Sequence, residues 1–335
     1  MSSLYKKLTV CCLMLCMLTG CAGSRQAMSG QADVVDETTE RTDTEQVDTG
    51  REKEPDIVCW GDSLTYGTGG EGVTYPSVLA DETGLTAYNY GVCGEKADQI
   101  AVRMGLYPMT TGAFTIPAER EPVALSLLCD GEDPIMLRLG DAGMNPCDIA
   151  GVKGELSYSE EDGNYYFTRQ TKGDAVTVSD GAVVTMDAAG KIDPDDIVVL
   201  FIGSNDRPTA EDAETLIATE KEMIRYLGSS KYIVVGLTSK EMIPEVAAVN
   251  EKLAAAFGTH FLDIRSYLLE HGLEEAGIAP TDQDLMDLAD GEIPSSLRVD
   301  IVHGTPDFYR ILGGAALRKN EIGRISLGGM TDGSA

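Results

Sequence analysis

Basic residues are scarce in this sequence. Its 335 residues include 26 Lys and Arg against 55 Asp and Glu, which gives a formal net charge of −29. A surface of this sign repels phosphate groups, so nucleic acid and anionic membrane surfaces are excluded as general partners. The charge fits a soluble, exported protein with an acidic surface, and solubility is its simplest role.

Groups that bind metals and long apolar segments are also scarce. None of the eight cysteines shows C-x-x-C spacing, so a structural zinc site is not expected. The clearest apolar run, residues 8–18, is too short to span a bilayer as a helix. Only three histidines exist, so a reaction that needs an imidazole base has three candidates.

The N-terminus shows the order of an export signal. Lys6 and Lys7 precede the apolar run, and small residues then lead to Cys21. This order resembles a bacterial lipoprotein signal, which implies that residues 1–20 are removed and that Cys21 carries a lipid. An ordinary secretory signal with an incidental cysteine is the alternative. Residues 21–54 are polar and acidic with few large apolar side chains, and we expect a disordered linker there.

Four cysteines lie in the remaining chain: Cys59, Cys93, Cys129 and Cys147. Export permits disulfides but does not require them. Cys129 and Cys147 share one region and could pair, and buried thiols are an equally good interpretation.

Five short apolar runs predict buried parallel strands. They are residues 56–60, 87–90, 197–202, 232–236 and 261–264. Helical patterns at 75–83, 96–103, 210–227, 246–257 and 306–317 alternate with them, and Thr209 to Asp212 predict a capping box. This alternation predicts an α/β fold, a three-layer α/β/α sandwich around a five-stranded parallel sheet, built from residues 55–105 and 193–320.

Residues 106–192 break that rhythm. Short alternating runs separated by Gly, Asp and Pro clusters predict a small all-β insertion of several hairpins, with strands at 114–116, 123–128, 135–139, 151–158, 165–169, 175–178 and 182–186. Residues 270–298 show a looser pattern, with short helices expected within 274–289, loop at 291–296 and a contribution to the wall of the site. Residues 321–335 form a C-terminal tail.

The first strand leads directly into a polar turn. Gly61 and Asp62 follow it, and Ser63 is presented at its carboxyl end, where open α/β sheets bind ligands. A serine there becomes a nucleophile only if a base takes its proton and donors hold an oxyanion. Asp62 is better placed to shape the turn than to react.

His303 is the best candidate for that base. Asp300 precedes it by three residues, so its carboxylate can accept from one ring nitrogen and leave the other for Ser63. An Asp at this spacing is weak evidence by itself. His260 and His271 are better interpreted as structural or solvated residues.

Candidate oxyanion donors follow the second and third strands. Gly94 allows a close backbone approach, so its N–H can face a substrate. Asn205, in the run Gly203 to Asp206, can offer its side-chain amide, and the N–H of Ser63 is a third donor. Taken singly, Gly94 and Asn205 are ordinary turn residues.

As an ordered set these residues are more specific. Gly61-Asp62-Ser63-Leu64, the run Asn89 to Gly94, the run Gly203 to Asp206 and the run Asp300 to His303 resemble the four blocks of the GDSL, or SGNH, hydrolase superfamily. The segment Thr305 to Leu312 also looks like the closing helix of that family. The resemblance covers about residues 55–105 and 193–318. It implies the flavodoxin-like SGNH fold and a family chemistry that needs no metal or other cofactor.

The resemblance also implies roles for the residues. Ser63 would be the nucleophile, His303 the general base and Asp300 its orienting partner, with Ser63, Gly94 and Asn205 forming the oxyanion hole. Two departures stand out. The β insertion is not part of the minimal family core, and Gly304 follows His303 where many members carry proline or a bulkier residue, which we expect to loosen the rim.

A lipid-anchored, extracytoplasmic serine esterase is the function that fits these features best. Its substrate would be a short acyl ester, most simply acetyl, on a carbohydrate, or a small ester. A lipase, arylesterase or thioesterase of the same superfamily is the first alternative, although aromatic residues make up only 6% of the chain. A non-catalytic, glycan-binding surface lipoprotein is the second. The insertion could bind glycan or only stabilise the fold.

Overall fold

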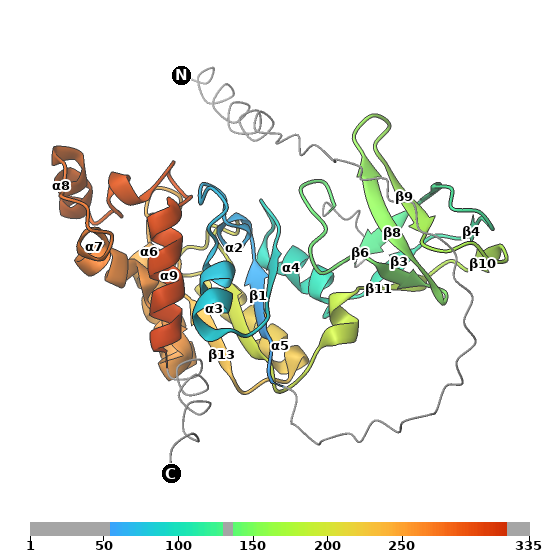
Figure 1. Ribbon diagram of the computed structural model, residues 1–335, viewed down its shortest axis with the longest axis horizontal. Helices are drawn as coiled ribbons and strands as arrows, with labels where there is room; N and C mark the ends of the chain where they lie inside the picture. Colours follow the sequence, from blue (N-terminus) through green and yellow to red (C-terminus); the bar gives the residue numbers. More distant parts are fainter. Residues whose placement is uncertain (1–53, 130–136, 320–335) are drawn as a thin grey trace, which may run out of the picture. The chain divides into compact units, whose positions relative to one another are not determined.

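The computed structural model describes residues 54–129 and 137–319 (Figure 1). The expected signal at 1–20, the lipidated Cys21, the linker up to residue 53 and the tail at 321–335 lie outside the described residues. Within those residues, no helix has the length and apolarity needed to cross a membrane.

A five-stranded parallel sheet forms the centre of the chain. Its strands are β1 (Ile57–Gly61), β2 (Ala87–Gly91), β12 (Ile197–Phe201), β13 (Tyr232–Val235) and β14 (Phe261–Leu262). They lie in the order β14-β13-β12-β1-β2, with every neighbouring pair parallel. This is the flavodoxin-like order, whose switch point lies between β1 and β12. The predicted fold class is confirmed.

Helices cover both faces of this sheet (Figure 1). Successive residues of a strand point to opposite faces, so Cys59 and Trp60 enter different cores. The core around Cys59 includes α3 (Tyr75–Thr83), α7 (Ile264–Glu275) and α9 (Pro306–Arg318). The core around Trp60 includes α4 (Ala97–Met104), α5 (Ala213–Leu227) and α6 (Val246–Phe257). The three layers follow from this alternation.

Two helices differ from the prediction. Helix α5 begins at Ala213 rather than 210, because Thr209 and Asp212 hydrogen-bond to each other ahead of the helix, and the Asp212 side chain caps no helical N–H. Helix α7 was not predicted, and the fifth strand is shortened because α7 begins at Ile264. Gly272 lies inside α7, where a Cβ would lie 2.6 Å from Leu297. Helix α8 (Asp282–Ala289) lies in the region expected to hold short helices.

Antiparallel strands occupy the region between α4 and β12. They are β3 (Met109–Thr111), β4 (Phe114–Ile116), β5 (Val123–Leu125), β6 (Leu127–Cys129), β7 (Cys147–Ile149), β8 (Val152–Ser159), β9 (Asn164–Arg169), β10 (Val176–Val178) and β11 (Ala182–Thr185). Seven form one sheet, in the order β5-β9-β8-β7-β11-β3-β6, and β10 pairs with β4. They enclose a core of their own that includes Ile149 and Phe167.

Some strands in this region were missed or misplaced. Strands β3 and β7 were not predicted, because each has three residues and includes polar ones, so neither stands out as an apolar run. Of the predicted strand at 135–139, residues 137–139 are described, and they form turn and bend rather than strand. Cys129 and Cys147 lie on β6 and β7, which β11 and β3 separate in the sheet. Three strand spacings, about 14 Å, are too long for a disulfide between them.

Candidate active site

Ser63 lies at the carboxyl end of β1, where the polypeptide turns into the short helix α2 (Ser63–Tyr66). Gly61 makes the turn possible, because a Cβ there would lie 2.4 Å from the carbonyl oxygen of Phe201. Asp62 caps α2, since its Oδ1 accepts the N–H of Leu64 at 2.9 Å. Ser63 therefore stands at the carboxyl end of β1, as its position in the sequence predicted, and the strand order places this end at the switch point of the sheet.

His303 reaches Ser63 from the other end of the chain. Its Nε2 lies 2.8 Å from Ser63 Oγ, and its Nδ1 lies 2.7 Å from Asp300 Oδ2. The three side chains therefore form a continuous hydrogen-bonded relay. Because the Asp300 carboxylate accepts a hydrogen bond from Nδ1, the favoured tautomer carries its proton on Nδ1. The lone pair of Nε2 then faces the serine hydroxyl.

Asp300 is held as a carboxylate. Partial burial raises its pKa, but hydrogen bonds from the His303 ring and from the N–H groups of His303 and Val302 outweigh burial and lower the pKa to about 2. Asp300 is consequently charged at any neutral or mildly acidic pH. It can orient the imidazole and stabilise the imidazolium that forms when His303 accepts a proton.

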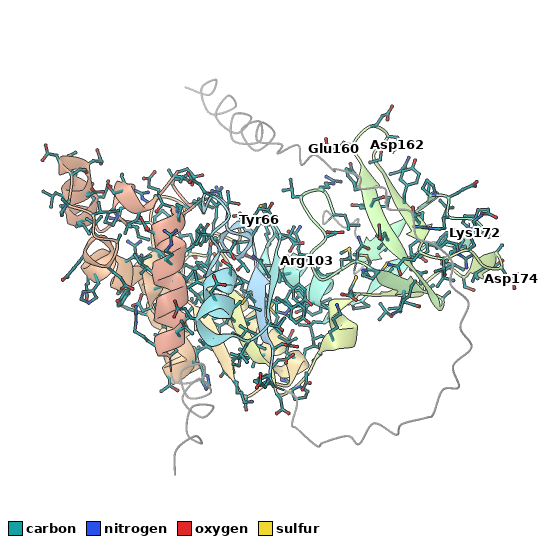
Figure 2. All side chains as sticks on the ribbon, viewed as in Figure 1. Tyr66, Arg103, Glu160, Asp162, Lys172 and Asp174 are labelled. Carbon is teal, nitrogen blue, oxygen red and sulfur yellow. The ribbon has the colours of Figure 1, made fainter. Side chains whose placement is uncertain are left out.

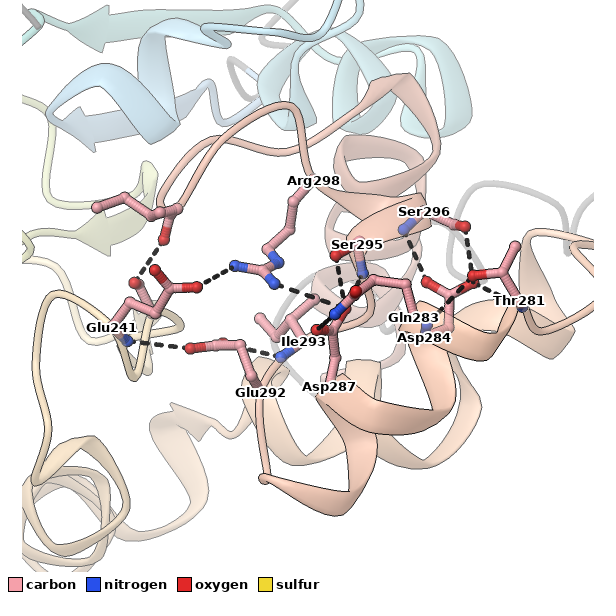
Figure 3. A network of polar contacts seen from close by, with 12 residues as sticks. Glu241, Thr281, Gln283, Asp284, Asp287, Glu292, Ile293, Ser295, Ser296 and Arg298 are labelled. Atoms are coloured by element: carbon pink, nitrogen blue, oxygen red, sulfur yellow. Dashed lines mark hydrogen bonds and ion pairs between the residues drawn. The ribbon is translucent and has the colours of Figure 1, made fainter.

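The loop that carries Asp300 and His303 is closed at its base by Arg298. Arg298 and Gly304 form a β-bridge, and the N–H of Val299 donates to the carbonyl of His303. The Arg298 guanidinium lies between Glu241, at 3.5 Å, and Asp287, at 3.7 Å (Figure 3). Asp287 belongs to α8, so the loosely patterned stretch before residue 298 anchors the loop.

Further contacts in the same network hold this loop (Figure 3). Asp287 accepts the N–H and the hydroxyl of Ser295, at 2.7 and 2.6 Å. Ser239 Oγ donates to the carbonyl of Ile301 at 2.5 Å. The sequence pattern did not predict this network, because its members come from four separate segments.

Gly304, which we expect to loosen the rim, lies close against α9. A Cβ at Gly304 would lie 2.2 Å from the ring of Phe308, so a larger residue would collide with α9. The hydroxyl of Tyr309, also on α9, donates to the carbonyl of Thr68 at 2.6 Å. Helix α9 therefore ties the loop after α2 to the loop that carries His303.

The candidate oxyanion donors lie on the loops around Ser63. Asn205 Nδ2 donates to the carbonyl of Glu95 at 2.9 Å and to Asp62 Oδ2 at 3.3 Å. Asn205 is thus linked to the neighbours of both Ser63 and Gly94. Gly94 has a φ of +78°, in the left-handed region that favours glycine.

A buried ion pair lies beneath these loops, and the sequence pattern did not single it out. Arg103 on α4 is fully buried, and its Nη2 lies 2.7 Å from Glu95 Oε2. Its guanidinium also donates to the carbonyls of Gly61, at 3.3 Å, and Ala142, at 2.5 Å. Figure 2 shows Arg103 beside α4. One signal was present: Arg103 follows the buried Ile100 by three residues, which places it on the apolar face of the helix.

Burial changes the protonation of Asp62. The pKa of that carboxyl is raised to about 7, chiefly by burial. The N–H of Leu64 and the charge of His303 lower the pKa, whereas the negative charges of Asp206 and Glu95 raise it. Asp62 contacts Leu64 and Asn205 rather than the hydroxyl of Ser63. Its role as a turn-shaping residue agrees with these contacts.

The other two histidines lie in different surroundings. His260 stacks on Tyr232, with ring centroids 3.9 Å apart, and its Nδ1 contacts the carbonyl of Tyr232. His271 is exposed and lies 3.6 Å from the carboxylate of Glu270. Neither contacts Ser63 or Asp300 in the described residues.

Two hollows in the described part of the chain bear on the site. One, of about 310 Å³, is lined by Tyr66 of α2 and by residues 139–142. The other, of about 300 Å³, lies against the sheet and is lined by Trp60, Tyr88 and Lys191, among others. Neither lining includes a residue of the relay, but Tyr66 of the first hollow lies on α2, the helix that begins at Ser63.

Comparisons with known proteins found similar solved structures only. No family model and no curated protein matches the chain. A member of the lipolytic protein G-D-S-L family from Veillonella parvula DSM 2008 is 14% identical, with a TM-score of 0.40 over 78% of this chain and 96% of its own. A lipase/acylhydrolase from Enterococcus faecalis is 14% identical, with a TM-score of 0.39 over 81% of this chain and 96% of its own.

A third structure is described as a peptidoglycan O-acetylesterase in action. It is 11% identical, with a TM-score of 0.35 over 82% of this chain and 92% of its own.

Proposed function

We propose that this chain is a serine ester hydrolase of the GDSL, or SGNH, type. The observation that carries the proposal is the relay from Ser63 Oγ through His303 to Asp300, with contacts of 2.8 and 2.7 Å. A serine, an imidazole and an ionised carboxylate in this order form the arrangement that activates a hydroxyl for acyl transfer.

In this mechanism Ser63 Oγ attacks the ester carbonyl while His303 Nε2 accepts the hydroxyl proton. Asp300 stabilises the resulting imidazolium, and His303 then returns the proton to the leaving alcohol. The acyl group remains on Ser63 as an ester. Water, deprotonated by the same imidazole, attacks this intermediate and releases the acid, which regenerates the serine.

The oxyanion would be held by the N–H groups of Ser63 and Gly94 and by the amide of Asn205. The Asn205 amide has two hydrogens. Its contact with Glu95 is short, at 2.9 Å, and its contact with Asp62 is longer, at 3.3 Å. We expect the longer contact to be the one that an oxyanion replaces.

The substrate in this proposal is a short acyl ester, most simply acetyl, on a carbohydrate. Support comes from the hollow beside α2, whose lining mixes an exposed tyrosine with amide and carboxylate groups. A lipase-like preference is the second candidate, since Val299 and Ile301, on either side of Asp300, are 53% and 46% exposed. Those side chains could contact a longer acyl chain.

We also propose that the chain is an extracytoplasmic lipoprotein held at the membrane by Cys21. The signal-like order of residues 1–21 supports this location. Replacing Cys21 with alanine should move the protein from the membrane fraction to the soluble fraction. A Cys21→Ala protein that stays with the membrane after processing would remove the lipid from the proposal.

Ester hydrolysis by the purified mature chain tests the activity, measured as release of acetate from the polymers and of 4-nitrophenol from the small esters. Acetylated xylan, acetylated peptidoglycan, 4-nitrophenyl acetate and 4-nitrophenyl octanoate would be compared. Ser63→Ala should abolish release, and Ser157→Ala, an exposed serine on β8, should not. Preference for the octanoate would favour the lipase-like candidate. A folded protein that shows no Ser63-dependent hydrolysis of any ester would contradict the proposal.

A further inference from the structure

The hollow beside α2 is built from two parts of the chain. Tyr66 of α2 together with Asn89 and Gly91 of β2 form one side. Residues 139–142, from the connection between β6 and β7, form the other. The β-rich region between α4 and β12 therefore contributes directly to the surroundings of the candidate active site.

This hollow adjoins both the nucleophile and a candidate oxyanion donor. Tyr66 follows Ser63 by three residues on α2, a spacing that makes side chains neighbours on a helix. On the opposite side, a Cβ built on Gly94 would lie 3.2 Å from Leu139 Cδ1, so the Leu139 side chain lies close to the Gly94 backbone. A group bound in the hollow would lie next to an ester at Ser63.

The wall formed by residues 139–142 is held in place. The carbonyl of Ala142 accepts from Arg103 Nη1 at 2.5 Å, and the same arginine donates to the carbonyl of Gly61, just before the nucleophile turn. Asp141 accepts the N–H of Met144 through its backbone carbonyl, and its carboxylate accepts from Asn145 at 2.9 Å. One buried guanidinium thus bonds to both sides of the site, which preorganises the hollow.

The lining combines an aromatic face with a few polar groups. Tyr66 is 56% exposed and Leu139 is 53% exposed, so both large side chains of the lining are accessible to a bound molecule. Figure 2 shows Tyr66 near α2. Asn89 uses its Oδ1 to accept the N–H of Gly91, which leaves its amide N–H groups as donors. Asp141 supplies an exposed acceptor.

We propose that this hollow is the subsite for the sugar ring of the ester substrate. The apolar C–H face of a pyranose would pack on the Tyr66 ring, and its hydroxyls would donate to Asp141 and accept from Asn89. A volume of about 310 Å³ suits a single ring. Asp141 and the acidic chain as a whole disfavour uronates, so the ring is a neutral or amino sugar. This inference rests on the proposed function.

The kinetic test compares a glycan ester with a small ester. The ratio of kcat/KM for acetylated xylo-oligosaccharide or chito-oligosaccharide to that for 4-nitrophenyl acetate should fall at least tenfold in Tyr66→Ala, mainly through KM. Tyr66→Phe should keep the ratio, because the ring remains. Leu285→Ala, which removes another exposed apolar side chain, is the matched control. An unchanged ratio, or a changed preference for acyl length instead, would overturn the subsite.

A binding test separates this inference from the catalytic proposal. Ser63→Ala protein would be titrated by calorimetry with xylotetraose, chitotetraose and oligogalacturonate. We expect binding of at least one of the first two, no binding of the acidic oligomer, and loss of binding in Ser63→Ala/Tyr66→Ala. If the wild type is inactive but binds sugar through Tyr66, the esterase proposal fails and the subsite proposal stands. Failure of Ser63→Ala to bind any neutral or amino sugar would remove the subsite.

Discussion

At the scale of single residues, the site depends on contacts between positions far apart in the chain. Ser63 and His303 are separated by 240 positions and lie 2.8 Å apart at the relevant atoms. Asp300 and His303, in contrast, are three positions apart and are brought together by one turn. The local pair could be inferred from spacing, and the distant contact required the fold.

Asn205 should matter to rate more than to folding. Asn205→Ala removes the amide proposed to hold the oxyanion, so we expect kcat on 4-nitrophenyl acetate to fall about 10²–10³-fold, equivalent to about 2.7–4 kcal/mol. Loss of its hydrogen bond to the carbonyl of Glu95 should cost only about 1 kcal/mol of unfolding free energy.

Steady-state kinetics and urea unfolding would be measured on the same Asn205→Ala preparation. Covalent labelling of Ser63 by a fluorophosphonate should persist, since the relay is intact. A decrease in kcat of less than about tenfold would show that Asn205 is a turn residue and not an oxyanion donor.

At the scale of elements, α4 does more than cover the sheet. It carries Arg103, whose guanidinium pairs with Glu95 and donates to the carbonyls of Gly61 and Ala142. The helix therefore connects the turn that carries Ser63, the loop that carries Gly94 and the wall of the hollow. A buried charge of this kind is stable only while its partner is present.

Removing only the arginine of the Arg103–Glu95 pair should lower the stability of the folded protein. Arg103→Met leaves the carboxylate of Glu95 buried without its counter-charge, so we expect the free energy of unfolding to fall by about 3–5 kcal/mol. Arg103→Met/Glu95→Gln should recover part of that loss, because the uncompensated charge is removed.

Urea unfolding of the two single variants and the double variant forms a complete cycle. Arg310→Met, which removes an exposed arginine paired with Asp307, is the control and should change stability by less than about 1 kcal/mol. Additive effects of Arg103→Met and Glu95→Gln would contradict the coupling.

At the scale of the whole molecule, buried carboxyls link stability to pH. Glu220 on α5 is fully buried, and neither of its carboxyl oxygens has a hydrogen-bond partner within the described residues. Burial, and then the charge of Asp206, raises its pKa well above the ordinary value. The pKa of Asp62 is raised in the same direction, to about 7.

Glu220 should make the protein less stable as pH rises. Below the unfolded-state pKa of about 4.3, both states hold the proton. Above it the unfolded state ionises while the folded state stays protonated, so the free energy of unfolding falls until pH passes the folded-state pKa. In Glu220→Gln this contribution is absent. Between pH 5 and pH 8 the variant should therefore lose less stability than the wild type.

Urea unfolding at both pH values measures that difference. The change in stability should be smaller in Glu220→Gln than in the wild type by more than about 1 kcal/mol. Glu251→Gln, at an exposed position on α6, is the matched control and should follow the wild type. Parallel losses in Glu220→Gln and the wild type would show that Glu220 does not titrate as proposed.

The sequence by itself determined the layers and the candidate relay. Apolar runs and helical periodicity record which faces are buried, so the five parallel strands and α3, α4, α6 and α9 were predicted to within about two residues at nearly every boundary. Motifs at the ends of predicted strands indicated Ser63, Gly94 and Asn205, because the carboxyl ends of parallel strands meet at one edge of a sheet.

Only the tertiary structure decided which distant groups meet. Arg103 and Glu95, the network around Arg298, and the hollow between Tyr66 and residues 139–142 join segments that share no local pattern. It also separated Cys129 from Cys147 by two strands and packed Gly304 against Phe308, where a Cβ would lie 2.2 Å from the ring. Periodicity reports whether a side chain is buried, but the identity of its neighbours depends on how the elements pack.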